Sequence, residues 1–197
     1  MEHLDWFEHY GRFLDESGFR TAFSSVDKLT MSLGRNLHYF HGRNIENIRM
    51  SNIADAVNVN GWASASTRTD IVDMYRNPTG PPCILQYYTQ PLYVAVKLRE
   101  KVMPVGTVPV ADIFIINEEN LNGKFTLELD CAGPENGIVF TKNYPVTVKG
   151  GEVFGELLVE GVVLPAVTIP GYYKLNARIT DGIQVKAAGF DDIYTVD

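Results

Sequence analysis

The hydrophobic periodicity changes near Leu92, and this change constrains the fold more than any other feature of the sequence. Before it, apolar residues recur at the three- and four-residue spacing of amphipathic helices. After it, they alternate in short runs separated by Gly, Pro and Asn, which is typical of strands and turns. The sequence therefore predicts the α+β class, with two domains. Residues 1–91 would be helical with one strand, and residues 92–197 an antiparallel β-sandwich of immunoglobulin-like type.

Charge and composition narrow the function classes. The chain has 197 residues, a net charge of -7 and two cysteines. An acidic chain without a Lys/Arg cluster argues against nucleic acid as a partner. Apolar runs stay well short of the ~20 residues of a membrane span, so we expect no membrane partner. Cys83 and Cys131 fit no metal motif, and we expect both to be free and packed.

Three helices are predicted in the first fifty residues. The first covers residues 3–16 and is followed by Gly18, a suitable C-terminal cap. A short second helix would end at Gly34, and a third would cover residues 37–50. Residues 83–89 would form a further short helix, ended by Pro91.

The second half predicts seven short strands. Asp181-Gly182 is a strong hairpin signal, and Gly189 suggests a bulge in the last strand. The expected strands are 93–99, 111–117, 125–130, 138–148, 153–159, 172–179 and 183–196.

The stretch Val57-Asn58-Val59-Asn60-Gly61-Trp62 alternates like a strand, with amides and an indole on one side. Sugar faces stack on aromatic rings, and sugar hydroxyls take hydrogen bonds from amides. Asn60 and Trp62 are therefore candidate sugar contacts. The alternative is a strand end with a core Trp, which composition alone favours.

Other polar groups favour structural roles. His38 and His41 stand three residues apart on one predicted helix, but a packed or surface pair is more common than a zinc site without further ligands. Asp70 and Asp73 lie in a turn-rich passage, where loop capping is the commoner role. Glu46 lies between arginines at i-3 and i+3, which favours an ion pair over catalysis. The sequence predicts no metal site and no cofactor.

Several segments resemble a known enzyme family. They are NLHYFHGRNIENIRMSNIADAVNVNGW (36–62), IVDMYRNPTGPP (71–82), QPLYVAVKLREKVMPVG (90–106), ADIFIINEENLNGKFTLEL (111–129) and the closing DDIYTVD (191–197). Together they resemble the C-terminal part of glycoside hydrolase family 2, the group of β-galactosidases and β-glucuronidases. The resemblance is spread over nearly the whole chain and contains no single diagnostic motif.

This resemblance implies a specific arrangement. In the family a (β/α)8 barrel runs directly into immunoglobulin-like sandwiches, so residues 1–91 would be a remnant of the barrel end. Residues 56–62 would be its eighth strand, and Asn60 and Trp62 would lie at the floor of the sugar pocket. The parent would hydrolyse O-glycosidic bonds, with carbohydrate as its partner, in the periplasm or outside the cell. The location of this chain itself stays open.

The resemblance also implies that the chain is inactive alone. Family catalysis uses two glutamates on earlier barrel strands. No residue here matches either one, and the sequence predicts no catalytic residue. The glutamates of the N-terminal part, Glu2, Glu8, Glu16 and Glu46, are the candidates, and none of them matches a family position.

Two further interpretations remain open. The chain could be a standalone carbohydrate-binding or protein-interaction module, with Tyr87, Tyr88, Tyr172 and Tyr173 as contacts. An open barrel end could also self-associate through its exposed aromatic residues.

Overall fold

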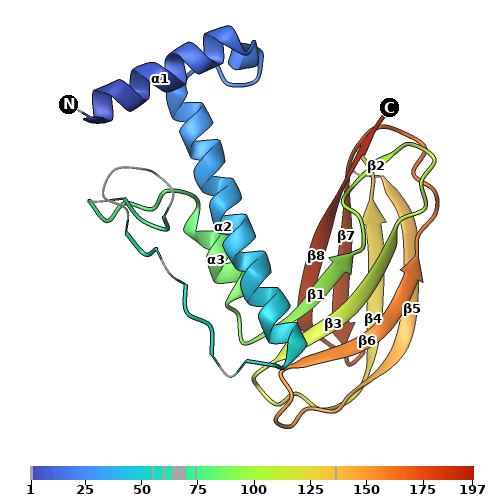
Figure 1. The fold of residues 1–197 in the computed structure, drawn as a ribbon. Coiled ribbons are helices and arrows are strands. Elements are labelled where there is room, and N and C mark those ends of the chain that lie inside the picture. The colour runs from blue at the N-terminus through green and yellow to red at the C-terminus, as the bar shows by residue number, and fades with distance from the viewer. Residues whose placement is uncertain (1, 55, 60, 64–69, 74, 136) are drawn as a thin grey trace. The chain divides into compact units, whose positions relative to one another are not determined.

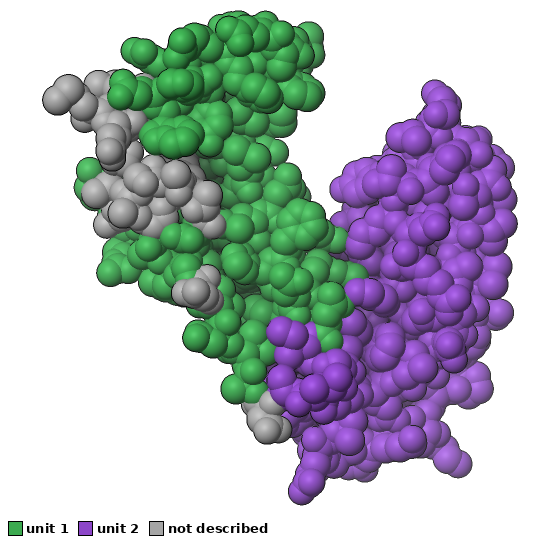
Figure 2. All heavy atoms as spheres, in the orientation of Figure 1, with its two compact units in different colours: residues 1–47, 55–89 green, residues 48–54, 90–197 purple. Residues whose placement is uncertain are grey.

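The computed structural model describes residues 2–54, 56–59, 61–63, 70–73, 75–135 and 137–197, with side chains from Asp5 onward. It divides into two compact units, coloured separately in Figure 2. Unit 1 comprises residues 1–47 and 55–89, and unit 2 comprises residues 48–54 and 90–197. A helical part followed by a β-sandwich confirms the predicted α+β class.

Helices dominate unit 1 (Figure 1). They are α1 (Glu2–Glu16), the short 3-10 helix η1 (Phe19–Thr21), α2 (Val26–Ser51) and α3 (Pro82–Tyr88). The last residues of α2, from Ile48 onward, belong to unit 2. Leu14, Val26 and Leu29 form a small buried cluster, against which Tyr10 and Phe23 pack. None of the helices in the described residues is long and apolar enough to cross a membrane.

The predicted helix end at Gly34 is wrong, because α2 continues unbroken from Val26 to Ser51. Gly34 is buried, and a Cβ atom placed on it would lie 1.8 Å from the Thr79 carbonyl oxygen. The absence of a side chain at this position therefore permits a close backbone approach. In the sequence, a glycine that permits a close backbone contact cannot be distinguished from a glycine that caps the end of a helix.

The predicted strand at residues 56–62 is also wrong. In the described part of this stretch, residues 56–59 and 61–62 form no strand, and Ala63 makes an isolated parallel bridge to Val72. The alternation of Val57 and Val59 is present, but a strand needs a neighbour for its backbone groups.

Unit 2 is a sandwich of two sheets (Figure 1). The three-stranded sheet has the order β1-β3-β6, and the five-stranded sheet has the order β2-β8-β7-β4-β5. The strands are β1 (Leu92–Leu98), β2 (Val102–Pro104), β3 (Val110–Asn117), β4 (Gly123–Ala132), β5 (Ile138–Val148), β6 (Gly155–Val163), β7 (Gly171–Thr180) and β8 (Val185–Val196).

The core of unit 2 lies between these sheets. Val94, Ile113 and Ile115 from the smaller sheet join Leu175 and Ile193 from the larger one in a single buried cluster. Alternating inward residues from both sheets thus produce the two-residue period of the sequence. All the named strand pairs are antiparallel except β2 and β8, which are parallel.

Three details of the sandwich differ from expectation. The sequence did not predict β2. The bulge expected at Gly189 is wrong, because Gly189 pairs regularly with Ala177 and the register of β8 shifts between Ala187 and Val185. Both cysteines are free, but Cys83 is exposed whereas Cys131 is buried, so the prediction of two packed cysteines holds for Cys131 alone.

Residues 48–54 are attached to the rest of unit 2 by side-chain contacts. The Asn52 amide donates to the Gly155 carbonyl oxygen at 2.7 Å and accepts from the Gly155 N–H at 2.9 Å. The Arg49 guanidinium lies 2.7 Å from a Glu118 carboxylate oxygen and donates to the Gln90 carbonyl oxygen at 2.8 Å.

Candidate functional site

Trp62 is an exposed side chain of unit 1, with 59% of its surface accessible. The core-Trp alternative is therefore wrong. Asn60, its predicted partner in a sugar site, lies outside the described residues. The chain turns next to Trp62, where Gly61 has a φ of 88°. A Cβ atom on Gly61 would lie 2.6 Å from Asp70 Oδ1, so the backbone passes close to this carboxylate.

Backbone hydrogen bonds join the Trp62 segment to residues 70–79. The Val72 N–H donates to the Trp62 carbonyl oxygen at 3.0 Å, and the Thr79 N–H donates to the Ile71 carbonyl oxygen at 3.0 Å. The Thr79 hydroxyl also donates to the Asp70 carbonyl oxygen. The segment that carries the indole therefore has defined neighbours.

His38 attaches this loop to α2. The side chain is fully buried. Its Nδ1 lies 3.2 Å from the Pro81 carbonyl oxygen, and its Nε2 lies 3.3 Å from the Ile71 carbonyl oxygen and 3.3 Å from the Thr79 hydroxyl. Both ring nitrogens thus face protein oxygens. This is what we expect of a packed histidine, as opposed to a zinc ligand. Nothing in the sequence identified His38 as the anchor of a loop more than thirty residues away.

The predicted loop-capping role of Asp73 is confirmed. Its carboxylate accepts the backbone N–H of Tyr75 at 2.8 Å and that of Asn77 at 2.9 Å. An aspartate that binds its own downstream backbone stabilises a turn. This use of the carboxylate differs from acid–base chemistry.

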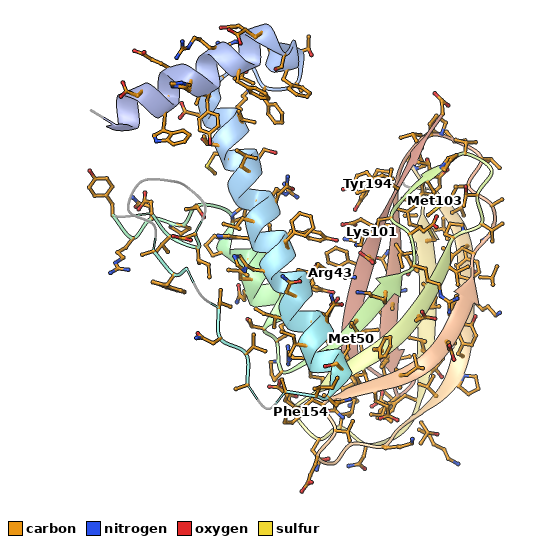
Figure 3. The ribbon with its side chains drawn as sticks, in the orientation of Figure 1. Arg43, Met50, Lys101, Met103, Phe154 and Tyr194 are labelled. Atoms are coloured by element: carbon orange, nitrogen blue, oxygen red, sulfur yellow. The ribbon has the colours of Figure 1, made fainter. Side chains whose placement is uncertain are left out.

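Glu46 is ion-paired, as the arginine spacing indicates, but the pair is buried instead of lying on a solvated face. Arg43 Nη1 lies 2.8 Å from Glu46 Oε1, with side chains 8% and 1% exposed. Arg43 is labelled on α2 in Figure 3. Removing one partner of a buried ion pair is strongly destabilising, so Glu46 has a structural role here.

Tyr88 lies beside this ion pair. Burial is the main cause that raises the pKa of its phenol well above the ordinary value, and Arg43 acts in the opposite direction. A Cβ atom on Gly42 would lie 2.0 Å from the Tyr88 ring, so glycine also sets the α2–α3 packing distance.

The described residues contain no group of three or more His, Cys, Asp and Glu that could hold a metal ion.

The four tyrosines of the binding-module interpretation have different environments. Tyr88 and Tyr173 are buried, and Tyr87 is half-buried with its ring 5.0 Å from that of Tyr88. Tyr172 is exposed on β7, and its ring lies 5.5 Å from that of Tyr194 on β8. The pairing of Tyr172 with Tyr194 depends on strand register, which is why the sequence did not identify Tyr194.

No protein-family model and no curated protein matches this chain. Solved structures match about half of it. A glycosyl hydrolase family 2 member from Bacteroides cellulosilyticus matches 54% of this chain and 16% of its own, with 17% identity and a TM-score of 0.41. A beta-glucuronidase from glycoside hydrolase family 2 matches 53% of this chain and 11% of its own, with 13% identity and a TM-score of 0.40. The CARDB domain of a Pyrococcus furiosus protein matches 53% of this chain and 92% of its own, with 16% identity and a TM-score of 0.41. These similarities are too distant to assign a family or an activity.

Proposed function

We propose that this chain is a non-catalytic segment of a glycoside hydrolase similar to family 2. In this proposal unit 1 is the last part of the catalytic barrel and unit 2 is the sandwich that follows it. The parent enzyme hydrolyses O-glycosidic bonds, and this segment closes the barrel and supports its sugar pocket. The sequence resemblance supports the family, and a helical part followed by a sandwich agrees with it.

The exposure of Trp62 is the observation that carries the proposal. The flat apolar face of an exposed indole suits the apolar face of a sugar ring. The Trp62 carbonyl oxygen accepts the Val72 N–H, and the neighbouring Ile71 contacts buried His38 of α2. A binding side chain on an anchored loop pays less conformational entropy when its ligand arrives.

The surface of unit 1 also supports a larger parent. Trp6, Phe7 and Phe13 on α1 and Phe19 on η1 are each about half exposed. A cluster of exposed aromatic side chains of this kind marks an interaction surface. In the proposal, the preceding part of the barrel covers it.

In this proposal the two catalytic carboxyl groups belong to a part of the parent enzyme outside this segment. A retaining glycosidase places two carboxyl groups about 5–5.5 Å apart, one as acid/base and one as nucleophile. Glu46 is buried against Arg43 and cannot approach a substrate. We therefore expect the 197-residue chain to leave aryl glycosides intact, and measurable hydrolysis by pure protein would contradict the proposal.

Tryptophan fluorescence tests the sugar contact directly, because the chain has two tryptophans. In a Trp6→Phe variant Trp62 is the single emitter, and we expect a saturable emission change with methyl β-galactoside or methyl β-glucuronide. The Trp62→Phe variant, in which Trp6 is the single emitter, is the matched control and should not respond. An unchanged Trp62 emission with both sugars would contradict the Trp62 contact.

A standalone binding module is the second candidate function. The exposed Tyr172–Tyr194 pair on unit 2 favours it, because this pair belongs to the sandwich alone. Binding by this pair would not require the rest of a catalytic barrel.

A further inference from the structure

The outward face of the five-stranded sheet in unit 2 combines aromatic and polar side chains. Along β7 the odd-numbered residues Tyr173 to Ile179 are buried in the core, and β8 alternates in the same way. The even-numbered residues therefore point away from the core. Those used below are Glu128 and Asp130 of β4, Tyr172, Lys174, Asn176 and Arg178 of β7, and Phe190, Asp192 and Tyr194 of β8. We call these nine residues the outer platform.

Two tyrosines lie at one end of the outer platform. Tyr172 and Tyr194 are direct cross-strand partners, and their rings are 5.5 Å apart with an interplanar angle of 52°. They are 43% and 49% exposed. The Tyr172 hydroxyl donates to Asp192 Oδ1 at 2.7 Å, which fixes the ring's position. Figure 3 labels Tyr194 on β8.

The charged groups of the outer platform have partners within it. Lys174 Nζ lies 3.9 Å from the centre of the Phe190 ring, a cation–π contact. Arg178 donates to Asp130 Oδ1 at 2.8 Å and lies 3.6 Å from Glu128. The Asn176 amide donates to Asp130 Oδ2 at 2.8 Å. The platform is therefore a network of pre-positioned side chains.

We propose that the outer platform binds a neutral glycan chain. The paired tyrosines offer ring faces for the apolar side of pyranose rings, and the carboxylates and amide beside them can exchange hydrogen bonds with sugar hydroxyls. Three carboxylates against two cations give the platform a slight negative charge, which disfavours polyanions such as nucleic acid or uronate polymers. This site lies on unit 2, and it does not depend on the function proposed for Trp62.

A second protein is a weaker match to the same surface. Charged residues are depleted at the core of protein interfaces. Here Lys174, Arg178 and Asp130 occupy the middle of the face and are already bonded to one another or to Phe190. Covering them with an apolar partner would desolvate them without adding new partners. Sugar hydroxyls instead provide both donors and acceptors.

Affinity electrophoresis of the 197-residue chain tests this site. Native gels would contain laminarin, hydroxyethyl cellulose, xyloglucan or galactan, with polygalacturonate as the anionic comparison. We expect at least one neutral polysaccharide to retard the wild-type protein, and polygalacturonate to leave it unaffected. Tyr194→Ala and Tyr172→Ala should each weaken the retardation by about tenfold, since each removes one aromatic contact. Tyr172→Phe keeps the ring and should lose less.

Two control variants separate this site from others. Phe154→Ala removes an exposed aromatic residue of unit 2 that precedes β6, and it should bind as the wild type does. Trp62→Ala should also bind normally, so a failure of the Trp62 contact and a failure of the platform are distinguishable. Circular dichroism melts would show that each variant is folded.

Three results would overturn the inference. One is the absence of retardation by all four neutral polysaccharides. Another is retardation that both tyrosine-to-alanine variants retain. The third is a wild-type dimer in sedimentation that Tyr194→Ala dissociates, because the platform would then be an interface between copies of this chain.

Discussion

Gly34 and Thr79 approach so closely that an added Cβ atom on Gly34 would lie 1.8 Å from the Thr79 carbonyl oxygen. The contact joins α2 to the loop that carries Trp62. Gly80 takes part in the same contact, because a Cβ atom added to it would lie 2.5 Å from the Gly34 carbonyl oxygen. Two glycines thus permit a backbone-to-backbone contact that other residues would prevent.

Gly34→Ala should destabilise unit 1. Alanine favours helices over glycine by about 1 kcal/mol, but the clash with backbone atoms should cost more, about 2–3 kcal/mol net. Urea unfolding followed by circular dichroism measures the difference. Gly11→Ala is the matched control, because its Cβ would meet Val26 at an ordinary 3.9 Å. We expect that variant to be neutral or slightly stabilised, and a Gly34→Ala protein as stable as Gly11→Ala would contradict the account.

His38→Ala should release the loop from α2. The buried ring contacts oxygen atoms of Ile71, Thr79 and Pro81, so its loss leaves a cavity and removes hydrogen bonds, at a cost of about 2–4 kcal/mol. Hydrogen exchange should accelerate at the Val72 and Thr79 amides, which are bonded within this loop. His9→Ala is the control, since His9 is exposed. Unchanged exchange at both loop amides would show that His38 does not hold the loop.

The two cysteines should differ sharply in reactivity. Cys83 is exposed, whereas burial raises the pKa of the Cys131 thiol to about 11. The thiolate is the reactive form, so Cys131 should be inert at neutral pH for both reasons. A disulfide exchange reagent should label one thiol per native chain and two after unfolding. Rapid labelling of two native thiols would contradict the buried environment of Cys131.

The Asp112–Arg99 pair should contribute to stability in a pH-dependent way. The hydrogen bond from Arg99 is the main cause that lowers the pKa of Asp112 below its ordinary 3.8, and the Gly161 N–H lowers it further. A carboxyl group with a lowered folded-state pKa stabilises the fold above its unfolded-state pKa, and the contribution is lost as the pH falls. Arg99 is half exposed, so water and salt screen the pair, and the contribution should be small and decrease with salt.

Comparison of wild-type protein with Asp112→Asn tests this contribution. The wild type should be more stable at about pH 6, and the difference should shrink as the pH approaches about 3. A difference that stays constant over this range would mean that Asp112 acts through neutral hydrogen bonding alone.

The exposed aromatic residues of unit 1 should cause self-association. Trp6 and Phe7 lie on α1 with about half of their surface accessible, and burial of such side chains favours association. Sedimentation velocity should show a larger species that grows with protein concentration. Phe7→Asp should reduce it, and Tyr75→Asp, at an exposed site of the loop, should not. A wild-type monomer at high concentration would contradict this expectation.

The sequence predicted the helices and strands in which the spacing of apolar residues follows the period of the element. The strands have a clear apolar side, because the sandwich core buries one face of most of them. Residues 3–16 have a clear helical period, although Leu14 is buried while Trp6 and Phe7 are about half exposed. β2 was missed because Val102–Pro104 is three residues long and pairs with β8, far away in the chain. The stretch at residues 56–62 has the period of a strand, but period alone does not provide a partner strand.

The candidate site was predictable only at the level of residue types. An indole beside a glycine marked Trp62, and the structure adds that it is exposed and lies on an anchored loop. The anchoring contacts of His38 depend on residues that are 33 to 43 positions distant. Likewise, Tyr194 joins Tyr172 because of the β7–β8 register. Long-range contacts of this kind follow from packing and leave no local pattern.

The DNA sequence immediately upstream of the Met1 codon tests the central claim most directly. If this chain is a segment of a family 2-like hydrolase that includes the last part of its barrel, the reading frame should continue upstream through seven more strand–helix repeats, with glutamates at the ends of two of the strands. An in-frame stop codon directly upstream of Met1, with no such repeats, would contradict the claim and leave the standalone binding module as the better account.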